Sequence, residues 1–254
     1  MMMHTTLAQL RALKLDGMAT GLEEQLTLAS MAALSFEERL TLLVDREVHC
    51  RRDRKLLRLL KSAQLKYGQA TIEDIDSRPG RGLDRRAVMS LALGDWVTSG
   101  HSVLITGQTG TGKSWLGCAL AQYACRRGYS ALYLRMPRLK EELHIRHASG
   151  TFGKWLLQLA NIDVLLLDDW GMGSLDSATR SDLLEIIDDR AGSKATIIAG
   201  QLPVEHWHAW IGDATIADAV LDRIMQRHHR FALTGESLRH PEQQKKPQET
   251  KPEE

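Results

Sequence analysis

Cysteines and long apolar runs are scarce in this sequence. The three cysteines, Cys50, Cys118 and Cys125, are an odd number without a close Cys-x-x-Cys pair, which argues against a disulfide framework and against a zinc knuckle. No stretch approaches the roughly 18 apolar residues of a membrane span, and the first residues lack the charged and apolar regions of an export signal. We therefore expect a globular protein of the reducing cytoplasm, with no membrane partner.

Proline is absent from residues 5–66, and β-branched runs are almost absent there. Apolar residues such as Leu22 and Leu26 recur at helical spacing in this segment. Ser35 and Glu38 have the spacing of a capping box, a reciprocal pair of hydrogen bonds at the beginning of a helix. The pattern predicts an all-helical amino-terminal segment.

The helical periodicity ends in a turn-rich stretch. Residues 76–82 contain Pro79, Gly80 and Gly82, which interrupt the pattern. We place a domain boundary here, with a helical domain over residues 1–75 and a second domain over residues 76–239. Residues 240–254 are rich in Gln, Lys, Pro and Glu and have no apolar anchor, so we expect a disordered tail.

Short apolar runs alternate with helix-length segments after residue 102. Five of these runs have the composition of strands, at residues 103–106, 131–134, 162–167, 196–199 and 230–233. Because the runs are continuously apolar, both faces of the sheet should be covered by helices. The predicted fold class is α/β, a parallel sheet flanked by helices.

A glycine-rich motif joins the first of these strands to the next helix. Residues 107–114 read Gly-Gln-Thr-Gly-Thr-Gly-Lys-Ser and match the Gly-x4-Gly-Lys-Ser pattern of a P-loop. The glycines let the backbone turn tightly, so that N–H groups and the helix N-terminus surround a phosphate. Lys113 adds a positive charge, and the hydroxyl of Ser114 can ligate Mg²⁺.

This motif predicts ATP and Mg²⁺ as ligands, and a glycine-rich turn without a ligand is the alternative. Ser114 is the predicted metal ligand. The predicted nucleotide contacts are Gly107, Gln108, Thr109, Gly110, Thr111, Gly112, Lys113, Ser114 and Trp115.

Two acidic residues stand at the end of a later strand. Asp168 and Asp169 follow an apolar run that begins at Val164. Asp168 is predicted to support the magnesium ion through its water shell, and Asp169 to orient and polarise the water that attacks the γ-phosphate. The alternative is a solvated acidic turn before Gly171.

Several blocks of residues together resemble one family. They are the P-loop, Leu165–Gly171 around the acidic pair, Gln201–Trp207, Asp222–Ile224 and Gly235–Arg239. On these residues the chain resembles the IstB-like ATP-binding proteins of insertion sequences, which belong to the DnaC/IstB group of AAA+ ATPases. The resemblance extends over almost the whole chain, because Leu34–Leu40 and Gly82–Arg85 are also similar.

The resemblance implies an AAA+ ATPase of the ASCE class, a homo-oligomer in which a neighbouring subunit completes each ATP site. Gln201 matches a polar residue that contacts the γ-phosphate or the water, and a strand-end turn is the alternative. Arg223 matches the arginine finger that reaches the next subunit's site. A surface ion pair is the alternative for Arg223, and Arg227 and Arg230 are its rivals. The catalytic set is then Lys113, Asp169, Gln201 and Arg223.

The chain departs from a full AAA+ module at its carboxyl end. Only a polar tail follows Arg239, so no C-terminal helical lid is expected. Arg239 is consequently left as a candidate for the second nucleotide-sensing arginine.

Residues 46–66 are strongly basic, with eight Arg and Lys residues against two acidic ones. On a helix these cations form a stripe apart from the leucines. Such a face suits the phosphates of duplex DNA, largely without base reading, whereas a solvated face or one docked on an acidic partner is the alternative. The candidate DNA contacts are Arg51, Arg52, Arg54, Lys55, Arg58 and Lys61.

The resemblance implies an ATP-dependent helper that oligomerises on double-stranded target DNA and recruits or stimulates a partner transposase. Hydrolysis would regulate this assembly. A DnaC-like replicative helicase loader is the alternative within the class. A small-molecule phosphotransferase, and a DNA-binding adaptor that holds ATP without turnover, are alternatives of other kinds.

Overall fold

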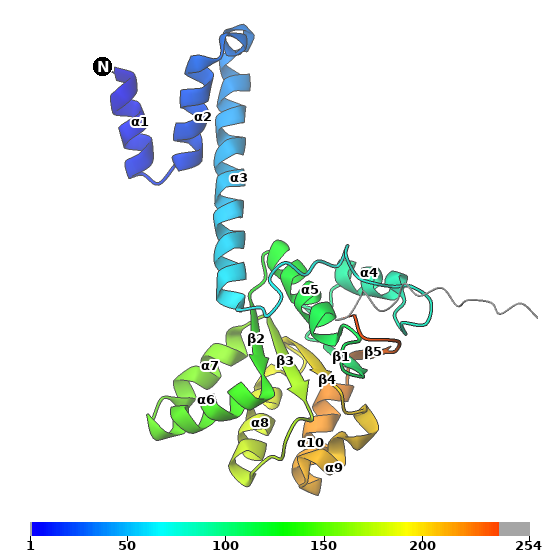
Figure 1. The fold of residues 1–254 in the computed structure, drawn as a ribbon. Helices are drawn as coiled ribbons and strands as arrows, with labels where there is room; N and C mark the ends of the chain where they lie inside the picture. The colour runs from blue at the N-terminus through cyan, green and yellow to red at the C-terminus, as the bar shows by residue number, and fades with distance from the viewer. Residues whose placement is uncertain (1, 239–254) are drawn as a thin grey trace, which may run out of the picture. The chain divides into compact units, whose positions relative to one another are not determined.

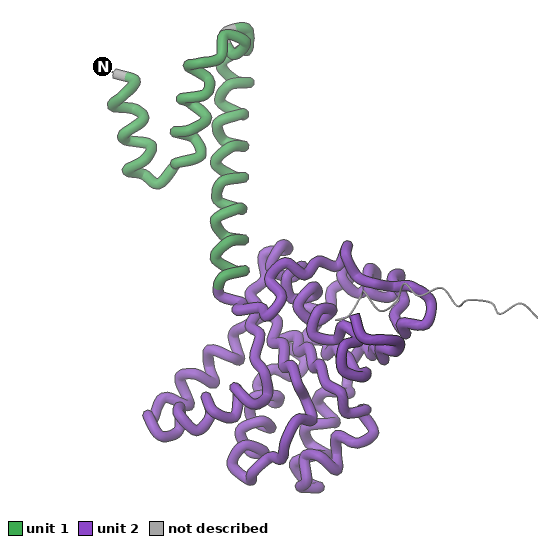
Figure 2. Tube along the Cα trace, in the orientation of Figure 1, with its two compact units in different colours: residues 1–61 green, residues 62–254 purple. Residues whose placement is uncertain are grey.

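The computed structural model describes residues 2–238 of the chain. Two compact units are present, residues 1–61 and residues 62–254, coloured separately in Figure 2. The division lies earlier in the chain than the predicted boundary at residue 75. Residues 62–75 belong to the second unit because Ala63, Ala70 and Ile72 are buried, and Glu73 accepts two hydrogen bonds from Arg126, at 2.9 and 3.0 Å.

The first unit is helical, as predicted. Its elements are α1 (Met2–Ala12), α2 (Asp16–Thr27), the short 3₁₀ helix η1 (Ala29–Ala33) and most of α3 (Phe36–Ala63), which continues into the second unit. The capping box at the beginning of α3 is confirmed, because the Ser35 N–H donates to Glu38 Oε2 at 2.7 Å and the Glu38 N–H donates to Ser35 Oγ at 3.3 Å.

Helices α2 and α3 pack closely at Gly17. A Cβ at this position would lie 2.7 Å from the Cα of Glu47. The buried Glu47 carboxylate accepts a hydrogen bond from the Met18 N–H at 3.2 Å and another from Arg51 Nε at 2.6 Å. The close approach of the two helix backbones and the buried, hydrogen-bonded carboxylate of Glu47 therefore hold α2 against α3.

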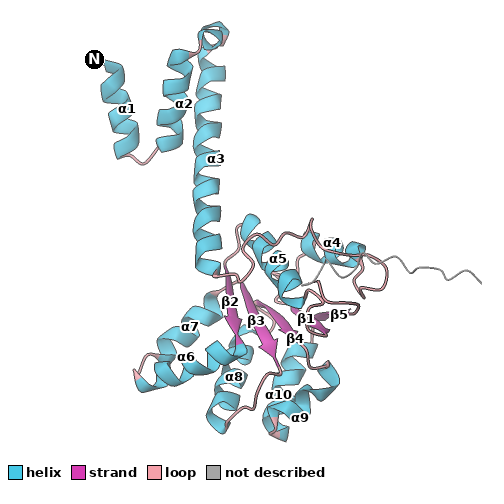
Figure 3. Cartoon of the chain, in the orientation of Figure 1, coloured by secondary structure: helices cyan, strands magenta, loops and turns pink. Residues whose placement is uncertain are grey.

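The second unit contains a parallel sheet of five strands in the order β2-β3-β4-β1-β5 (Figures 1 and 3). The predicted strands are confirmed, with ends that differ by at most three residues. Their bounds are β1 Ser102–Gly107, β2 Ala131–Arg135, β3 Val164–Trp170, β4 Ala195–Gly200 and β5 His228–Leu233. Because β4 pairs with both β1 and β3, it lies between the strand of the P-loop and the strand of the acidic pair.

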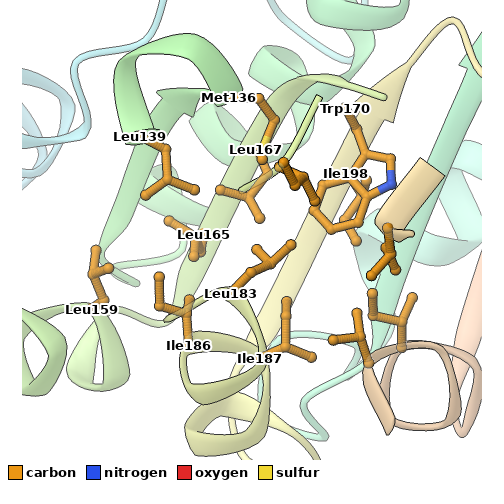
Figure 4. Close-up of a cluster of buried hydrophobic side chains, with 14 of the residues drawn as sticks. Met136, Leu139, Leu159, Leu165, Leu167, Trp170, Leu183, Ile186, Ile187 and Ile198 are labelled. Atoms are coloured by element: carbon orange, nitrogen blue, oxygen red, sulfur yellow. The ribbon is translucent and has the colours of Figure 1, made fainter. Parts of the chain in front are cut away.

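Helices cover both faces of this sheet. On one face Gly117 of α5 lies against Leu166 and Ile197. On the other, the neighbouring residues Leu165 and Ile198 pack with helices α6 to α10 in a buried cluster (Figure 4). The helices are α4 Arg85–Leu93, α5 Lys113–Arg126, α6 Met136–Ala148, α7 Phe152–Asn161, α8 Ser177–Arg190, η2 Val204–His206, α9 Trp207–Ile211 and α10 Ala214–Met225.

Residues 234–238 follow β5 without forming a helix. Arg239 and the tail predicted from residue 240 lie outside the described residues. Across residues 2–238, none of the helices is both long enough and apolar enough to span a bilayer.

Candidate nucleotide-binding site

The P-loop connects the carboxyl end of β1 to the N-terminus of α5, as its sequence predicts. Gly110 has φ +87°, a left-handed conformation that favours glycine. A Cβ at Gly107 would lie 2.3 Å from the Leu233 carbonyl oxygen. Inside the loop, Lys113 Nζ donates to the Gln108 carbonyl at 2.7 Å, and Thr111 Oγ1 donates to the same carbonyl at 2.8 Å. The loop is thus curved around an open concave face at a helix N-terminus, which is suited to an anion.

A cavity of about 590 Å³ opens beside this loop, within the range of small-molecule sites. Of the predicted nucleotide residues, Thr109, Gly110, Gly112, Lys113, Ser114 and Trp115 line it. Gly107, Gln108 and Thr111 are not among its lining residues. The Gln108 carbonyl accepts the two hydrogen bonds inside the loop. Asp169 and Gln201 line the same cavity, so the structure brings the phosphate loop together with two of the other predicted catalytic side chains.

The acidic pair at the end of β3 divides into a buried and a partly exposed carboxylate. Asp168 is 1% exposed and accepts hydrogen bonds from the Tyr133 hydroxyl at 2.8 Å and from the Asp169 N–H at 2.9 Å. Burial, followed by the charge of Asp168, raises the pKa of Tyr133 far above its usual value, so this hydroxyl stays protonated and donates. Asp168 is therefore held in place by hydrogen bonds and is not among the residues that line the cavity, so its predicted support of a metal ion would have to pass through water.

Asp169 has the left-handed backbone conformation, with φ +58°, which is uncommon for a residue other than glycine. Its Oδ2 accepts a hydrogen bond from Arg135 Nε at 2.6 Å. Arg135 ends β2, the strand next to β3. In this conformation the carboxylate that was predicted to polarise water is paired with an arginine.

The donor set fits a hydrated magnesium ion. Ser114 and Asp169 line one cavity, and Asp168 is the residue before Asp169 in the chain. Hydroxyl and carboxylate oxygens are the ligands that Mg²⁺ prefers, together with phosphate oxygens and retained waters.

Gln201 follows β4 directly and reaches the cavity because β4 lies between β1 and β3. Tryptophans hold the backbone around it. Trp207 Nε1 donates to the Leu202 carbonyl at 2.9 Å, and the ring of Trp170 lies 5.4 Å from that of Trp207. Figure 4 shows Trp170 in the core cluster. The loop after β4 is therefore anchored on the carboxyl edge of the sheet.

Arg223 is not among the cavity-lining residues of its own chain. It lies on α10, where its Nε donates to Asp188 of α8 and its Nη1 donates to the Ala219 carbonyl at 2.9 Å. Among its rivals, Arg227 is exposed and Arg230 pairs with Glu205 at 2.6 Å. The role of a finger toward another subunit stays a prediction.

Several cavity-lining residues have no motif that would have revealed them. Lys66 and Tyr67 follow α3, and the Tyr67 ring lies 5.5 Å from that of Trp115. Leu238 reaches the cavity from beyond β5. The other lining residues that sequence reasoning did not assign to the nucleotide site are Trp170, Gly171, Met172, Leu202 and Pro203.

The candidate DNA residues all lie on α3, and all are exposed. Two of them are already paired within the first unit, Arg51 with Glu47 at 2.6 Å and Arg54 with Asp16 at 2.7 Å. Within residues 2–238, no ion pair involves Arg52, Lys55, Arg58 or Lys61.

A P-loop at the carboxyl end of the inner strand β1, an acidic pair on β3 and the strand order β2-β3-β4-β1-β5 define a P-loop ATP-binding domain of the AAA+ type. Solved structures agree with this fold. The DnaC helicase loader aligns with TM-score 0.55 and 18% identity over 66% of this chain and 99% of that one. DnaI aligns with TM-score 0.57 and 21% identity over 65% of this chain and 92% of that one.

The chain belongs to the family described as IstB-like ATP binding protein, which matches residues 8–246. It is similar to an ATP-binding protein named for insertion sequence IS1162 of Pseudomonas fluorescens, with 57% identity over 80% of this chain and 88% of the relative. An insertion-sequence ATP-binding protein of Sinorhizobium fredii is 44% identical over 96% of this chain and the full length of the relative.

Proposed function

We propose that this chain is a Mg²⁺-dependent, DNA-stimulated ATPase of the bacterial cytoplasm that assembles on target DNA and recruits or stimulates a partner transposase. The observation that carries the proposal is the single cavity in which the P-loop, Asp169 and Gln201 meet. Membership of the IstB-like family supports it, as do relatives named for insertion sequences.

The residues of the cavity divide the work of hydrolysis. The P-loop N–H groups and Lys113 would hold the β- and γ-phosphates, while Ser114 and the water shell on Asp168 would hold Mg²⁺. The ion, when bound, neutralises charge on the phosphate oxygens. Asp169 would accept a hydrogen bond from the attacking water, and Gln201 would orient that water or the γ-phosphate.

Completion of the site by a second copy would make ATP a switch for assembly. Arg223 of a neighbouring subunit, released from Asp188, would approach the γ-phosphate, and an arginine finger contributes roughly 10³–10⁵ in rate. A monomer at working concentration, with full ATPase activity, contradicts this arrangement.

DNA binding is assigned to the exposed cations of α3. Arg52, Lys55, Arg58 and Lys61 have no ion-pair partner within the described residues, so they are available to phosphates. Counterion release predicts that each phosphate contact adds about −0.9 to the slope of log affinity against log salt. Replacement of Arg58 and Lys61 by Gln should therefore reduce the slope by about 2 and weaken binding to unrelated duplexes alike.

The direct test compares wild type with Lys113→Ala and Asp169→Asn, with Lys154→Ala, an exposed lysine on α7, as the matched control. We expect Lys113→Ala to lose ATP binding and ATP-dependent assembly on duplex DNA, and Asp169→Asn to bind ATP and assemble but not hydrolyse it. Light scattering and phosphate release measure the two effects. Assembly of Lys113→Ala equal to wild type refutes the switch, and capture of a replicative helicase without duplex binding favours a loader.

A further inference from the structure

The segment that follows β5 packs directly on the P-loop. We call residues 234–238 the exit segment. The Leu238 N–H donates to the Gly110 carbonyl at 2.9 Å. A Cβ at Gly110 would lie 2.2 Å from Ser237 Oγ, and one at Gly112 would lie 3.4 Å from Leu238 Cδ1. Two P-loop glycines therefore provide the space that the exit segment occupies.

A buried arginine joins this segment to the loop. Arg81 is 8% exposed. Its Nη1 donates to the Glu236 carbonyl at 2.6 Å, and its Nη2 donates to the Thr111 carbonyl at 3.2 Å. Its Nε lies 3.4 Å from Asp76 Oδ2, which supplies the opposite charge. The planar guanidinium fork of a single side chain thus holds the P-loop and the exit segment at a fixed spacing.

Backbone bonds strengthen the same junction. The Thr234 N–H donates to the Arg81 carbonyl at 2.9 Å, and Thr234 Oγ1 donates to the Gly80 carbonyl at 2.7 Å. Gly82 has no room for a side chain, because a Cβ would lie 2.2 Å from the Ala232 carbonyl oxygen. The turn around Arg81 is consequently locked to the end of β5, and the arginine cannot move without the exit segment.

The exit segment presents an apolar side chain to the nucleotide cavity. Leu238 lines the cavity and is 38% exposed, and its backbone N–H is held by the Gly110 carbonyl of the P-loop. A nucleotide in the cavity would cover this surface, and burial of apolar surface favours the bound state. The position of Leu238 depends on the clamp formed by Arg81.

We propose that Arg81 is a positioning residue for nucleotide retention, which clamps the exit segment on the P-loop so that Leu238 closes one side of the nucleotide cavity. Arg81 is not among the residues that line the nucleotide cavity, so its loss should accelerate ATP release and leave the hydrolysis step nearly intact. The inference rests on the nucleotide site of the proposed function, and it needs neither the DNA nor the transposase part.

The test measures release of a fluorescent ribose-labelled ATP analogue, with Mg²⁺, from the full-length protein, together with KM and kcat for ATP. The variants are Arg81→Met, Leu238→Ala and their combination. The matched control is Arg78→Met, because Arg78 is an exposed arginine whose side chain, within the described residues, bonds only to Asp76. We expect about tenfold faster release for each single variant, which corresponds to about 1.4 kcal/mol, with kcat within about twofold and no change for the control.

The double variant separates a clamp from a general structural role. If Arg81 acts through Leu238, the combination should release the analogue about as fast as either single variant, since coupled residues are not additive. If the double variant releases the analogue about a hundredfold faster, as the product of two independent tenfold effects, the inference is overturned. A release rate that Arg81→Met leaves unchanged also overturns it. If Arg81→Met does not fold, the exposed Leu238→Ala decides it, because unchanged release from that variant refutes the clamp. Wild type that fails to bind the analogue contradicts the nucleotide site itself, and the clamp with it.

Discussion

The ion pair between Arg135 and Asp169 leads to a prediction about the basal rate of the proposed ATP hydrolysis. Arg135 Nε lies 2.6 Å from Asp169 Oδ2, and hydrogen bonding to Asp169 raises the pKa of Arg135. While this pair is formed, Asp169 Oδ2 is engaged, and the positive charge of Arg135 makes the carboxylate a weaker hydrogen-bond acceptor for the attacking water. Replacement of Arg135 by Gln should release Asp169 and raise the basal rate of ATP hydrolysis.

The size of the effect follows from the exposure of the pair. The side chain of Arg135 is 49% exposed and that of Asp169 is 20% exposed, so solvent screens the attraction, and pairs of this kind contribute about 0.2–1 kcal/mol. Since about 1.4 kcal/mol is a factor of ten, release of the carboxylate should raise kcat by up to about fivefold. KM for ATP should change by less than about twofold, because Arg135 is not among the residues that line the nucleotide cavity.

Steady-state phosphate release without DNA measures both constants. The matched control is Arg138→Gln, because Arg138 is an exposed arginine of α6 that pairs with Glu141 and Glu142 instead. A fall in kcat for Arg135→Gln, with KM unchanged, would refute the reasoning, since Arg135 would then assist the reaction rather than restrain Asp169. An equal rise in the Arg138 control would show that the effect is one of net charge.

Two further predictions concern buried groups. Arg190 is 1% exposed and donates to three backbone carbonyls and to Thr196 Oγ1, and burial lowers its pKa to about 10. Because Arg190→Met leaves these acceptors unsatisfied, it should lower the free energy of unfolding, measured in urea, by about 3–5 kcal/mol. An unchanged urea midpoint would contradict this prediction. Burial raises the pKa of Cys118 and of Cys125 to about 11. At pH 8 iodoacetamide should therefore modify only the half-buried Cys50 in the native protein, and all three thiols in denaturant. Mass spectrometry measures the labelling, and rapid labelling of Cys118 in the native protein would disprove the prediction.

Features that depend on short stretches of chain were predictable. The capping box of Ser35 and Glu38 needs only four consecutive residues, and the P-loop at 107–114 needs a strand, a glycine-rich turn and a helix in that order. The strands were found because continuous apolar runs must be buried on both faces. The nucleotide cavity at the carboxyl ends of β1, β3 and β4 follows from the parallel arrangement of these strands.

The domain boundary was less accessible to sequence reasoning. The turn-rich stretch at 76–82 marks a change of secondary structure, whereas the compact units divide between Lys61 and Ser62, within one continuous helix. A helix that crosses a boundary leaves no break in periodicity, because the hydrogen bonds of its backbone are local. Only the burial of residues such as Ile72 shows to which unit this part of the chain belongs.

The sequence by itself determined the α/β class, the phosphate-binding loop, the acidic pair and the family, since each depends on residues adjacent in the chain or on simple periodicity. Only the tertiary structure decided that Arg135 pairs with Asp169, that Leu238 reaches the nucleotide cavity and that Arg81 holds it there. These contacts join segments distant in sequence, and their partners are set by strand order and by packing, which no local pattern of residues encodes.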